Sequence, residues 1–337
     1  MLVSIDSAVE HLKNDDVVAI PTETVYGLAA RIDSELAVKK IFSTKERPFF
    51  DPLIVHVASI DEAKTLTTEW TEEVSTLARA FWPGPLTLVL MKSDKVSDVI
   101  TSGLPRVGIR MPNHKIALEI IARVGVPLAA PSANKFGKTS PTKSVHVENE
   151  FKKENVAVVE GGECDIGIES TVLLVKPQGK MLELSILRHG GVSKTQIAEC
   201  LNVEHIQHQF TEVVSKNESP GHMKHHYMPN IPLVLVNESD FLSPQYILNR
   251  LNKEMKNLPD VIEDVKILKP KDEVTHIEEL VLSTNSSMAA RELYAKLRES
   301  SEKAGTEAIY FVLRDYHMKE EWLGILDRIT KAASLKF

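Results

Sequence analysis

The sequence lacks the features of a membrane protein, a disulfide-bonded secreted protein or a general nucleic-acid binder. It has two cysteines in 337 residues, Cys164 and Cys200, whose spacing matches no metal motif, so we expect buried free thiols. No apolar run is long enough to span a bilayer, and the opening stretch MLVSIDSAVEHLKNDD is too polar for a signal peptide. The net charge of −7 argues against indiscriminate binding to nucleic acid. These absences predict a cytoplasmic globular protein.

Common catalytic signatures are missing too, because HExxH, CxxC and GxSxG do not occur. The stretch PSANKFGKTSPT contains GKT, the end of a phosphate-binding P-loop, but Ser132 occupies the position of the first glycine. The later pair Ser140-Pro141 is the better helix start, which is too late for a P-loop. A P-loop is therefore disfavoured, although Ser132 and Asn134 can still offer a hydroxyl and an amide to a ligand.

What the first two hundred residues contain is an alternation of strands and helices. Asn113 can cap a helix in NHKIALEIIARVG, with Ile116, Ile120 and Val124 on one face and Gly125 at its end. Eight runs rich in β-branched residues predict strands, namely VVAIP, PLIVHV, PLTLVL, RVGIR, VPLAAP, VAVVE, STVLLV and SILRH. The pattern indicates an α/β domain with a large, twisted mixed sheet.

Apolar periodicity lapses after this domain and then returns. The later runs IPLVLV, VKILKP, ELVLST and AIYFVL predict strands. The stretch SMAARELYAKLRESSEKAG predicts a helix with Ala289, Leu293 and Leu297 on one face and a Glu292–Lys296 pair. The predicted organisation is an α/β domain at 1–205, a linker at 206–230 and a smaller three-layer α/β domain at 231–337.

Two short stretches suggest polar chemistry, each with a plainer alternative. Pro48 favours an extended Arg47, so Lys45 and Arg47 would project together and suit a polyphosphate, unless they form a solvated pair at a helix end. In PTETVYGLAA, Thr22, Thr24 and Tyr26 would share one face of a continuing strand, although both residue types also simply favour strands.

Further hydroxyls and cations lie at other predicted strand ends. Ser170 and Thr171 open one strand, Arg188 precedes a Gly-Gly turn, and Arg106 and Arg110 flank VGI. None of these features is specific alone. Together they favour the binding and positioning of an anionic substrate over a covalent nucleophile or a protein-bound metal.

The ordered set PTETVYGL, KERP, DPLIVH, WPGPLTLVL, VGIRMP, PSAN, SPT, GIESTV and ILRHG resembles the YrdC-like threonylcarbamoyl-AMP synthases. The resemblance covers residues 5–200, and SPGHMKHHYMP with the following segment resembles the linker and Rossmann-like C-terminal domain of the long members. It implies synthesis of threonylcarbamoyl-AMP and pyrophosphate from L-threonine, bicarbonate and ATP. Other proteins then use the product to modify tRNA, and a weak contact with RNA stays open.

The resemblance also implies a set of site residues. Mg²⁺ would arrive with ATP, Lys45 and Arg47 would be catalytic, and His56 would either orient a ligand or be a satisfied strand histidine. The implied L-threonine site is Thr24, His56, Arg110 and Ser170. The implied ATP site is Lys45, Arg47, Asp51, Arg106, Ser132, Asn134, Thr142, Arg188 and, from the linker, Tyr227.

Three alternatives remain at this point. A non-catalytic RNA-binding module would use the same fold, but the net charge is against it. A carbamoyl-adenylating module of the maturation factors would normally carry acylphosphatase and zinc-finger segments, which the sequence does not show. The linker histidines His222, His225 and His226 could hold a metal, but Pro220 and Pro229 favour a strap that closes over the nucleotide.

Overall fold

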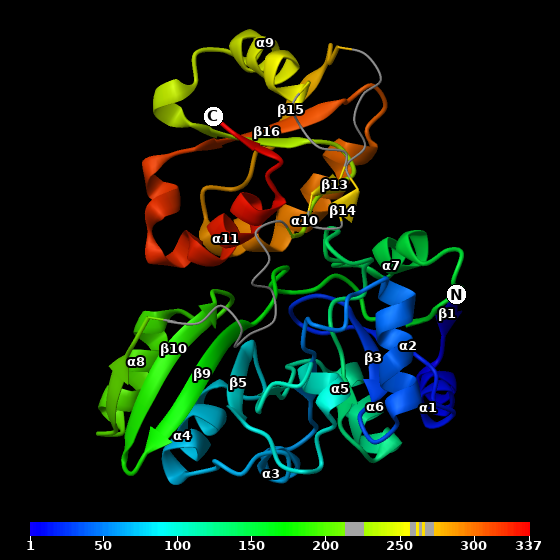
Figure 1. Cartoon of the computed structure of the whole chain (residues 1–337), viewed down its shortest axis with the longest axis vertical. Coiled ribbons are helices and arrows are strands. Elements are labelled where there is room, and N and C mark those ends of the chain that lie inside the picture. Colours follow the sequence, from blue (N-terminus) through cyan, green and yellow to red (C-terminus); the bar gives the residue numbers. More distant parts are fainter. Residues whose placement is uncertain (213–225, 257–260, 263–264, 267–272) are drawn as a thin grey trace. The chain divides into compact units, whose positions relative to one another are not determined.

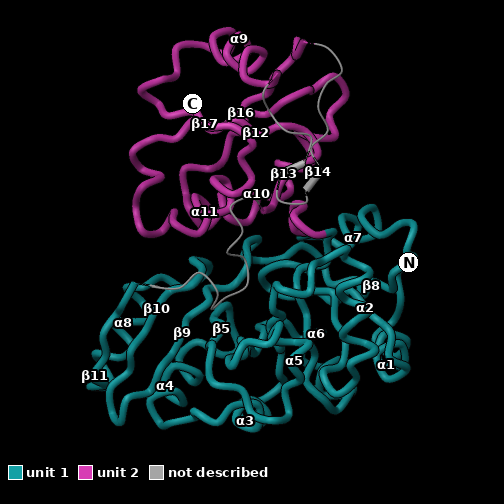
Figure 2. The backbone as a smooth tube through the Cα atoms, viewed as in Figure 1, with its two compact units in different colours: residues 1–135, 141–222 teal, residues 136–140, 223–337 magenta. Residues whose placement is uncertain are grey.

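The computed structural model describes residues 1–212, 226–256, 261–262, 265–266 and 273–337. These residues form two compact units, drawn in different colours in Figure 2. Unit 1 comprises residues 1–135 and 141–222, and unit 2 comprises residues 136–140 and 223–337. The short segment 136–140 therefore belongs to unit 2, although unit 1 precedes and follows it in the sequence.

Unit 1 is built on a large mixed sheet, as predicted, which has eleven strands in the order β1-β8-β2-β3-β7-β4-β6-β5-β9-β10-β11. Strands β3, β5, β9 and β10 of this sheet are labelled in Figure 1. All eight predicted strands are present, and β1, β3 and β11 are additions. The strands are β1 (Leu2–Val3), β2 (Val18–Ile20), β3 (Gly27–Arg31), β4 (Ile54–His56), β5 (Leu86–Met91), β6 (Arg106–Arg110), β7 (Leu128–Ala129), β8 (Ala157–Val159), β9 (Thr171–Gln178), β10 (Met181–Arg188) and β11 (Gln207–Phe210).

The helices of unit 1 confirm one prediction and correct its cap. The predicted helix is α6, which ends at Gly125 with φ of 82°, but its N-cap is His114 rather than Asn113 because the helix begins one residue later. The first helix after the PSAN stretch begins at Ser144, so GKT lies in a loop and no P-loop forms. The helices are α1 (Ile5–Lys13), α2 (Glu35–Lys45), α3 (Ile60–Lys64), α4 (Glu72–Phe81), α5 (Asp98–Thr101), α6 (Lys115–Val124), α7 (Ser144–Glu150) and α8 (Lys194–Val203).

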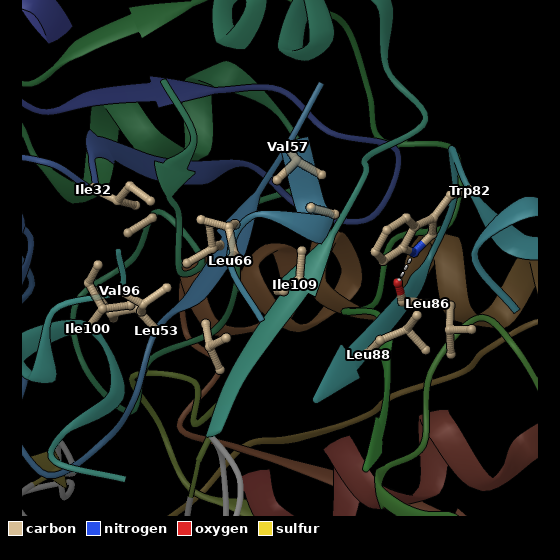
Figure 3. Packing of buried hydrophobic residues seen from close by; sticks show 14 of the residues in the cluster. Ile32, Leu53, Val57, Leu66, Trp82, Leu86, Leu88, Val96, Ile100 and Ile109 are labelled. Atoms are coloured by element: carbon tan, nitrogen blue, oxygen red, sulfur yellow. Dashed lines mark hydrogen bonds between the residues drawn. The ribbon is translucent and has the colours of Figure 1, made fainter. Parts of the chain in front are cut away.

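The central strands are buried on both faces, which holds their ends in fixed positions. Along β5, Leu86 and Leu88 point into the main core, whereas Val89 points into a second cluster on the other face. Figure 3 shows Leu88 beside Ile109 of β6, its cross-strand partner. It also shows Trp82, whose indole N–H donates to the Leu86 carbonyl at 2.6 Å and so satisfies its polar atom inside the core.

Unit 2 is a smaller α/β domain with a parallel sheet in the order β15-β16-β12-β17. The predicted strands at 231–236 and 308–313 and the predicted helix are confirmed, and Lys296 lies 3.1 Å from Glu292. The strand predicted at ELVLST lies earlier, and VKILKP falls largely outside the described residues. The elements are β12 (Leu233–Asn237), α9 (Pro244–Met255), β13 (Val261–Ile262), β14 (Val265–Lys266), β15 (Ile277–Glu279), α10 (Ser286–Glu302), β16 (Ala308–Leu313), α11 (Leu323–Ala332) and β17 (Leu335–Lys336), with single turns at Glu238–Asp240, Asp315–Met318 and Glu320–Trp322.

Both cysteines are free, as predicted, although only Cys164 is buried and Cys200 is partly exposed. Burial raises the pKa of the Cys164 thiol to about 12, and the nearby Glu23 carboxylate adds to the shift. This thiol therefore stays protonated and is a poor nucleophile. Among the described residues, no helix has the length and apolar character needed to cross a membrane.

Candidate active site

Arg110 is the centre of one group of predicted site residues. It ends β6, and the parallel register of β4 and β6 places His56 directly beside it. Its Nε donates to the Gly84 carbonyl at 3.2 Å and its Nη1 to Thr24 Oγ1 at 2.9 Å. Its Nη2 lies 2.6 Å from Glu23 Oε2. Thr24, His56 and Arg110, three of the four residues predicted to bind threonine, are thus brought together.

The PTET stretch reaches Arg110 through a turn, which corrects the prediction of a continuing strand. The strand β2 ends at Ile20. The Thr22 and Thr24 hydroxyls do meet, at 2.9 Å, but the Tyr26 hydroxyl donates elsewhere, to the Gly162 carbonyl at 2.9 Å. The turn forms because Thr22 Oγ1 accepts from the backbone N–H groups of Thr24 and Val25, an alternative to a ladder hydrogen bond.

His56 is an uncharged histidine in this setting. It is buried, and Nδ1 lies 3.3 Å from the Ile54 carbonyl, to which it can donate. Burial lowers the pKa of the imidazole to about 3, with a further lowering from the neighbouring Arg110 cation. A neutral ring that donates through Nδ1 keeps Nε2 as an acceptor, so His56 is suited to receive a hydrogen bond near neutral pH.

Ser170 and Arg188 lie side by side where β9 begins and β10 ends. Arg188 donates to the Ser170 carbonyl through Nε at 3.1 Å and Nη2 at 3.0 Å, and to Ser170 Oγ at 3.1 Å. Ser170 Oγ also lies 2.8 Å from Thr87 Oγ1. Ser170 was predicted for threonine and Arg188 for ATP, so this pair would stand where the two substrates meet.

The loop that contains WPGP connects this pair with Arg110. The Thr171 N–H donates to the Pro85 carbonyl at 2.9 Å, and the neighbouring Gly84 carbonyl accepts from Arg110. The loop therefore holds the start of β9 and the end of β6 at a fixed separation. Through it, all four residues predicted for threonine form one connected group.

Lys45 is buried and only 7% of the Arg47 side chain is exposed, so the alternative of a solvated pair is wrong. Lys45 ends α2, and its Nζ donates to the carbonyls of Ser132 and Asn134, both at 2.5 Å. Its burial, and next the charge of Arg47, lower its pKa well below the usual value. Residues 45–47 are not an extended segment, since Glu46 is left-handed with φ of 53°, and each side chain has its own partners.

Arg47 forms a buried ion pair with Asp51. Its Nη2 lies 2.8 Å from Asp51 Oδ2, while its Nε and Nη2 donate to the Asp51 and Pro52 carbonyls at 3.1 and 3.0 Å. These contacts fix the guanidinium along the loop that leads from α2 to β4. The guanidinium is therefore oriented before any ligand is bound, as a phosphate-binding group needs.

The Tyr26 backbone joins the two groups. Its N–H donates to the Pro141 carbonyl at 2.9 Å and its carbonyl accepts from Ala133 at 2.7 Å. The PTET turn therefore contacts the PSAN–SPT stretch on one side and Arg110 on the other. Thr142 Oγ1 in this stretch is buried and has no hydrogen-bond partner among the described residues, which leaves it open to a ligand.

Arg106 lies apart from these groups, and Tyr227 belongs to the other unit. Arg106 begins β6 and donates to Glu69 at 2.8 Å and to the Val175 carbonyl at 3.5 Å. Tyr227 belongs to unit 2, where its ring packs 5.8 Å from the Tyr294 ring and 5.5 Å from the Arg328 guanidinium. The linker residues His222 and His225 lie outside the described residues. Among the residues that the structure does describe, no cluster of His, Cys, Asp or Glu could hold a metal ion.

Glu23, Gly84 and Thr87 also contribute to the site, and none of the three was predicted. Gly84 acts through its backbone carbonyl, which leaves no signal in the sequence. Thr87 acts through a hydroxyl inside a strand, where threonine is common for structural reasons alone. Glu23 did have a signal, because it is an acidic residue between two threonines at the end of a buried strand.

Comparison with known proteins agrees with this architecture. A family model named Sua5_yciO_yrdC and described as telomere recombination matches residues 10–190. A model of the C-terminal domain of threonylcarbamoyl-AMP synthase matches residues 192–334. The large mixed sheet and the small parallel domain are those of a two-domain protein of this type. The chain belongs to the Sua5/YciO/YrdC family.

Named relatives and a solved structure are similar to the chain. It is 44% identical to threonylcarbamoyl-AMP synthase of Bacillus subtilis over 66% of this chain. The match spans 64% of that protein, which is less than two thirds of its length. It is 33% identical to threonylcarbamoyl-AMP synthase of Schizosaccharomyces pombe over 99% of this chain and 89% of that protein. A crystal structure of Pyrococcus abyssi Sua5 complexed with L-threonine shares 32% identity and a TM-score of 0.79, over 99% of this chain and 96% of that one.

Proposed function

We propose that this protein is an L-threonylcarbamoyladenylate synthase, a nucleotidyltransferase that converts L-threonine, bicarbonate and ATP to threonylcarbamoyl-AMP and pyrophosphate. The observation that carries the proposal is the connected group around Arg110, in which a fixed guanidinium, a neutral histidine and two hydroxyls come together. Such a group suits a small hydroxylated amino acid. The naming of L-threonine in the structure of the Pyrococcus abyssi relative supports this choice.

The roles in threonine binding follow from the chemistry of each group. Arg110 would bind the carboxylate, since its guanidinium is held by Gly84 and Thr24 and retains further N–H groups. His56 would accept a hydrogen bond through Nε2, and the side-chain hydroxyl of threonine is the natural donor. Thr24 and Ser170 would fix the amino acid from either side of Arg110. The threonine amine would then lose a proton and attack the carbon of bicarbonate, which gives a carbamate and releases water.

The second group would bind ATP and stabilise charge. The carbamate oxygen would attack the α-phosphorus, and pyrophosphate would leave. Arg47 and Arg188 would offset negative charge on the phosphates, and Lys45 would contribute to the same binding site. Asn134 and Thr142 would provide polar contacts to the nucleotide. ATP would enter as its Mg²⁺ complex, so the metal would be part of the substrate.

Cellular context completes the proposal. The product would pass to proteins that transfer the threonylcarbamoyl group to tRNA. A cytoplasmic location and a weak RNA contact remain predictions.

The proposal is tested by measuring pyrophosphate release from ATP in a four-way comparison. We expect release only when L-threonine and bicarbonate are both present, because the attacking group is formed from the two. Release without threonine would indicate a simple ATPase, and turnover with serine but not threonine would reject the threonine site. If no combination gave release while the protein bound RNA, the non-catalytic RNA-binding alternative would replace the proposal.

A further inference from the structure

Glu23 is a buried acid whose hydrogen-bonding capacity is unused. Only 3% of the residue is exposed, and its Oε2 lies 2.6 Å from Arg110 Nη2. The two groups are close enough for an ion pair, but the nitrogen is not aimed along a hydrogen bond. Neither carboxylate oxygen accepts a hydrogen bond from the described residues. A carboxylate is acceptor-only and has room for several donors, so this is an unusual state for a buried one.

The surrounding turn directs its donors away from Glu23. The N–H groups of Thr24 and Val25 both donate to Thr22 Oγ1, at 3.2 and 3.3 Å. Had they turned to the neighbouring carboxylate, they would have satisfied it locally. Leaving a buried charged acceptor without donors is more costly than leaving a neutral one. Such a cost at a candidate site points to a donor that arrives with a ligand.

The hydroxyls of the turn cannot serve Glu23 either. The Thr22 hydroxyl donates to the Val25 carbonyl at 2.7 Å, which uses its proton. In the 2.9 Å contact between the two hydroxyls, Thr24 must therefore be the donor and Thr22 the acceptor. Thr24 Oγ1 in turn accepts from Arg110. The chain of hydroxyls thus runs from Arg110 to the Val25 carbonyl and has no proton left for Glu23.

The result is a cation and an anion side by side with complementary open positions. Arg110 presents N–H donors, and Glu23 presents two acceptor oxygens. An isolated arginine would attract any carboxylate, including that of a hydroxy acid. An arginine paired with an open carboxylate fits a zwitterion, whose carboxylate and ammonium groups are equally close together.

We propose that Glu23 receives the α-amino group of the amino-acid substrate and makes the site selective for amino acids over other small carboxylic acids. This inference rests on the proposed function and deepens it. No bond is made or broken by Glu23 in this role. Its contribution is a contact with the amine that a substrate without an amine cannot make, and such a contact discriminates strongly because the partner is left unpaired in its absence.

The test is a set of calorimetric titrations with L-threonine and with its analogue in which a hydroxyl replaces the α-amino group. We expect the wild-type protein to bind threonine at least tenfold more tightly than the analogue. In Glu23→Gln, threonine should weaken at least tenfold while the analogue binds as before or better. Glu23→Asp retains the charge opposite Arg110 and withdraws the oxygens by one methylene, so it should show an intermediate loss. ATP affinity should be unchanged in both variants.

Two results would overturn the inference. Equal weakening of threonine and analogue would show that Glu23 acts only by orienting Arg110, and unchanged affinities would show that it does not act on the substrate. If Glu23→Gln failed to fold, Glu23→Asp and the wild-type comparison would still decide, since a wild-type preference below tenfold rejects amine selection. A wild-type protein that bound no threonine at all would instead reject the proposed function.

Discussion

His56 makes the stability of unit 1 depend on pH in a defined direction. Its folded pKa of about 3 lies below the 6.5 of an unperturbed histidine. Below pH 6.5 the unfolded chain takes up a proton that the folded chain does not, so stability is complete above this value and falls with acid. The loss approaches about 1.4 kcal/mol per pH unit, or about 2 kcal/mol between pH 6.5 and pH 5.

We therefore predict that His56→Gln flattens the acid limb of the stability curve. Urea denaturation followed at pH 7, 6 and 5 should show about 2 kcal/mol less loss for the variant than for the wild type. His317 of unit 2, whose pKa is lowered to about 4 by burial, contributes equally to both proteins and cancels in the difference. The matched control is His205→Asn, which removes an exposed histidine of unit 1 at a left-handed position, outside the site. Parallel curves for His56→Gln and wild type would contradict the uncharged state of His56.

At the scale of single elements, the sequence predicted strands well where a run is rich in β-branched residues. Runs such as TLVL and TVLLV carry β-branched residues and become long central strands. The strand β3 was missed because GLAAR has glycine and alanine and obtains its strand form from its neighbours. The PTET turn was misassigned because threonine favours strands and turns alike, and the choice depends on which backbone groups its hydroxyl reaches.

The candidate site was predictable only in part, because some of its contacts depend on residues that are distant in the sequence. Hydroxyls and cations at strand ends pointed to Arg110 and Ser170, which are joined in one group, but equally to Arg106, which lies apart from it. The carbonyl partners of Lys45 lie 87 and 89 residues away in sequence, and no local pattern could indicate them. Burial of this cation therefore had to come from the tertiary structure.

The turn after β10 offers a test at the element scale, because adjacent glycines differ in the space around them. A Cβ on Gly190 would lie 2.3 Å from the Thr171 N and 2.4 Å from the Glu169 O, both rigid backbone atoms. A Cβ on Gly191 would lie 3.1 Å from the nearest atoms, which belong to the Pro85 ring. Gly190→Ala must therefore move the start of β9 away from the end of β10.

We predict that Gly190→Ala destabilises the protein by about 1–3 kcal/mol in chemical denaturation and weakens L-threonine binding at least tenfold in calorimetry. The weakening follows because Ser170 would leave its position beside Arg188. Gly191→Ala is the matched control and should cost less than about 1 kcal/mol, with threonine binding close to wild type. Indistinguishable behaviour of the two variants would show that the approach of β9 to this turn does not position the site.

At the scale of the whole molecule, the division into units does not follow the chain at residues 136–140. Within unit 2, the Met228 N–H donates to the Gly137 carbonyl at 2.8 Å and the Thr139 hydroxyl donates to the Tyr227 carbonyl at 3.2 Å. Arg298 donates to the Thr139 carbonyl. The segment between the predicted nucleotide contacts Asn134 and Thr142 is thus held by residues that come much later in the sequence.

A chain ending at residue 212 tests what the contacts of residues 136–140 with the rest of unit 2 contribute to substrate binding. It keeps β11 and the hydrogen bond from the Thr211 N–H to the Leu184 carbonyl, so the sheet of unit 1 is complete. It removes every unit 2 partner of residues 136–140. We predict that it folds cooperatively, with a single denaturation transition.

The two substrates should respond differently to this truncation. Arg110 and Ser170 are held by contacts within unit 1, so L-threonine should bind as in the full chain. ATP should bind about tenfold more weakly, because Asn134 and Thr142 would flank a segment that has lost its partners and must be ordered on binding. Calorimetric titration of both ligands into both proteins measures the difference. Equal loss of both affinities would indicate general damage to unit 1, and unchanged ATP affinity would show that unit 2 does not organise the nucleotide site through residues 136–140.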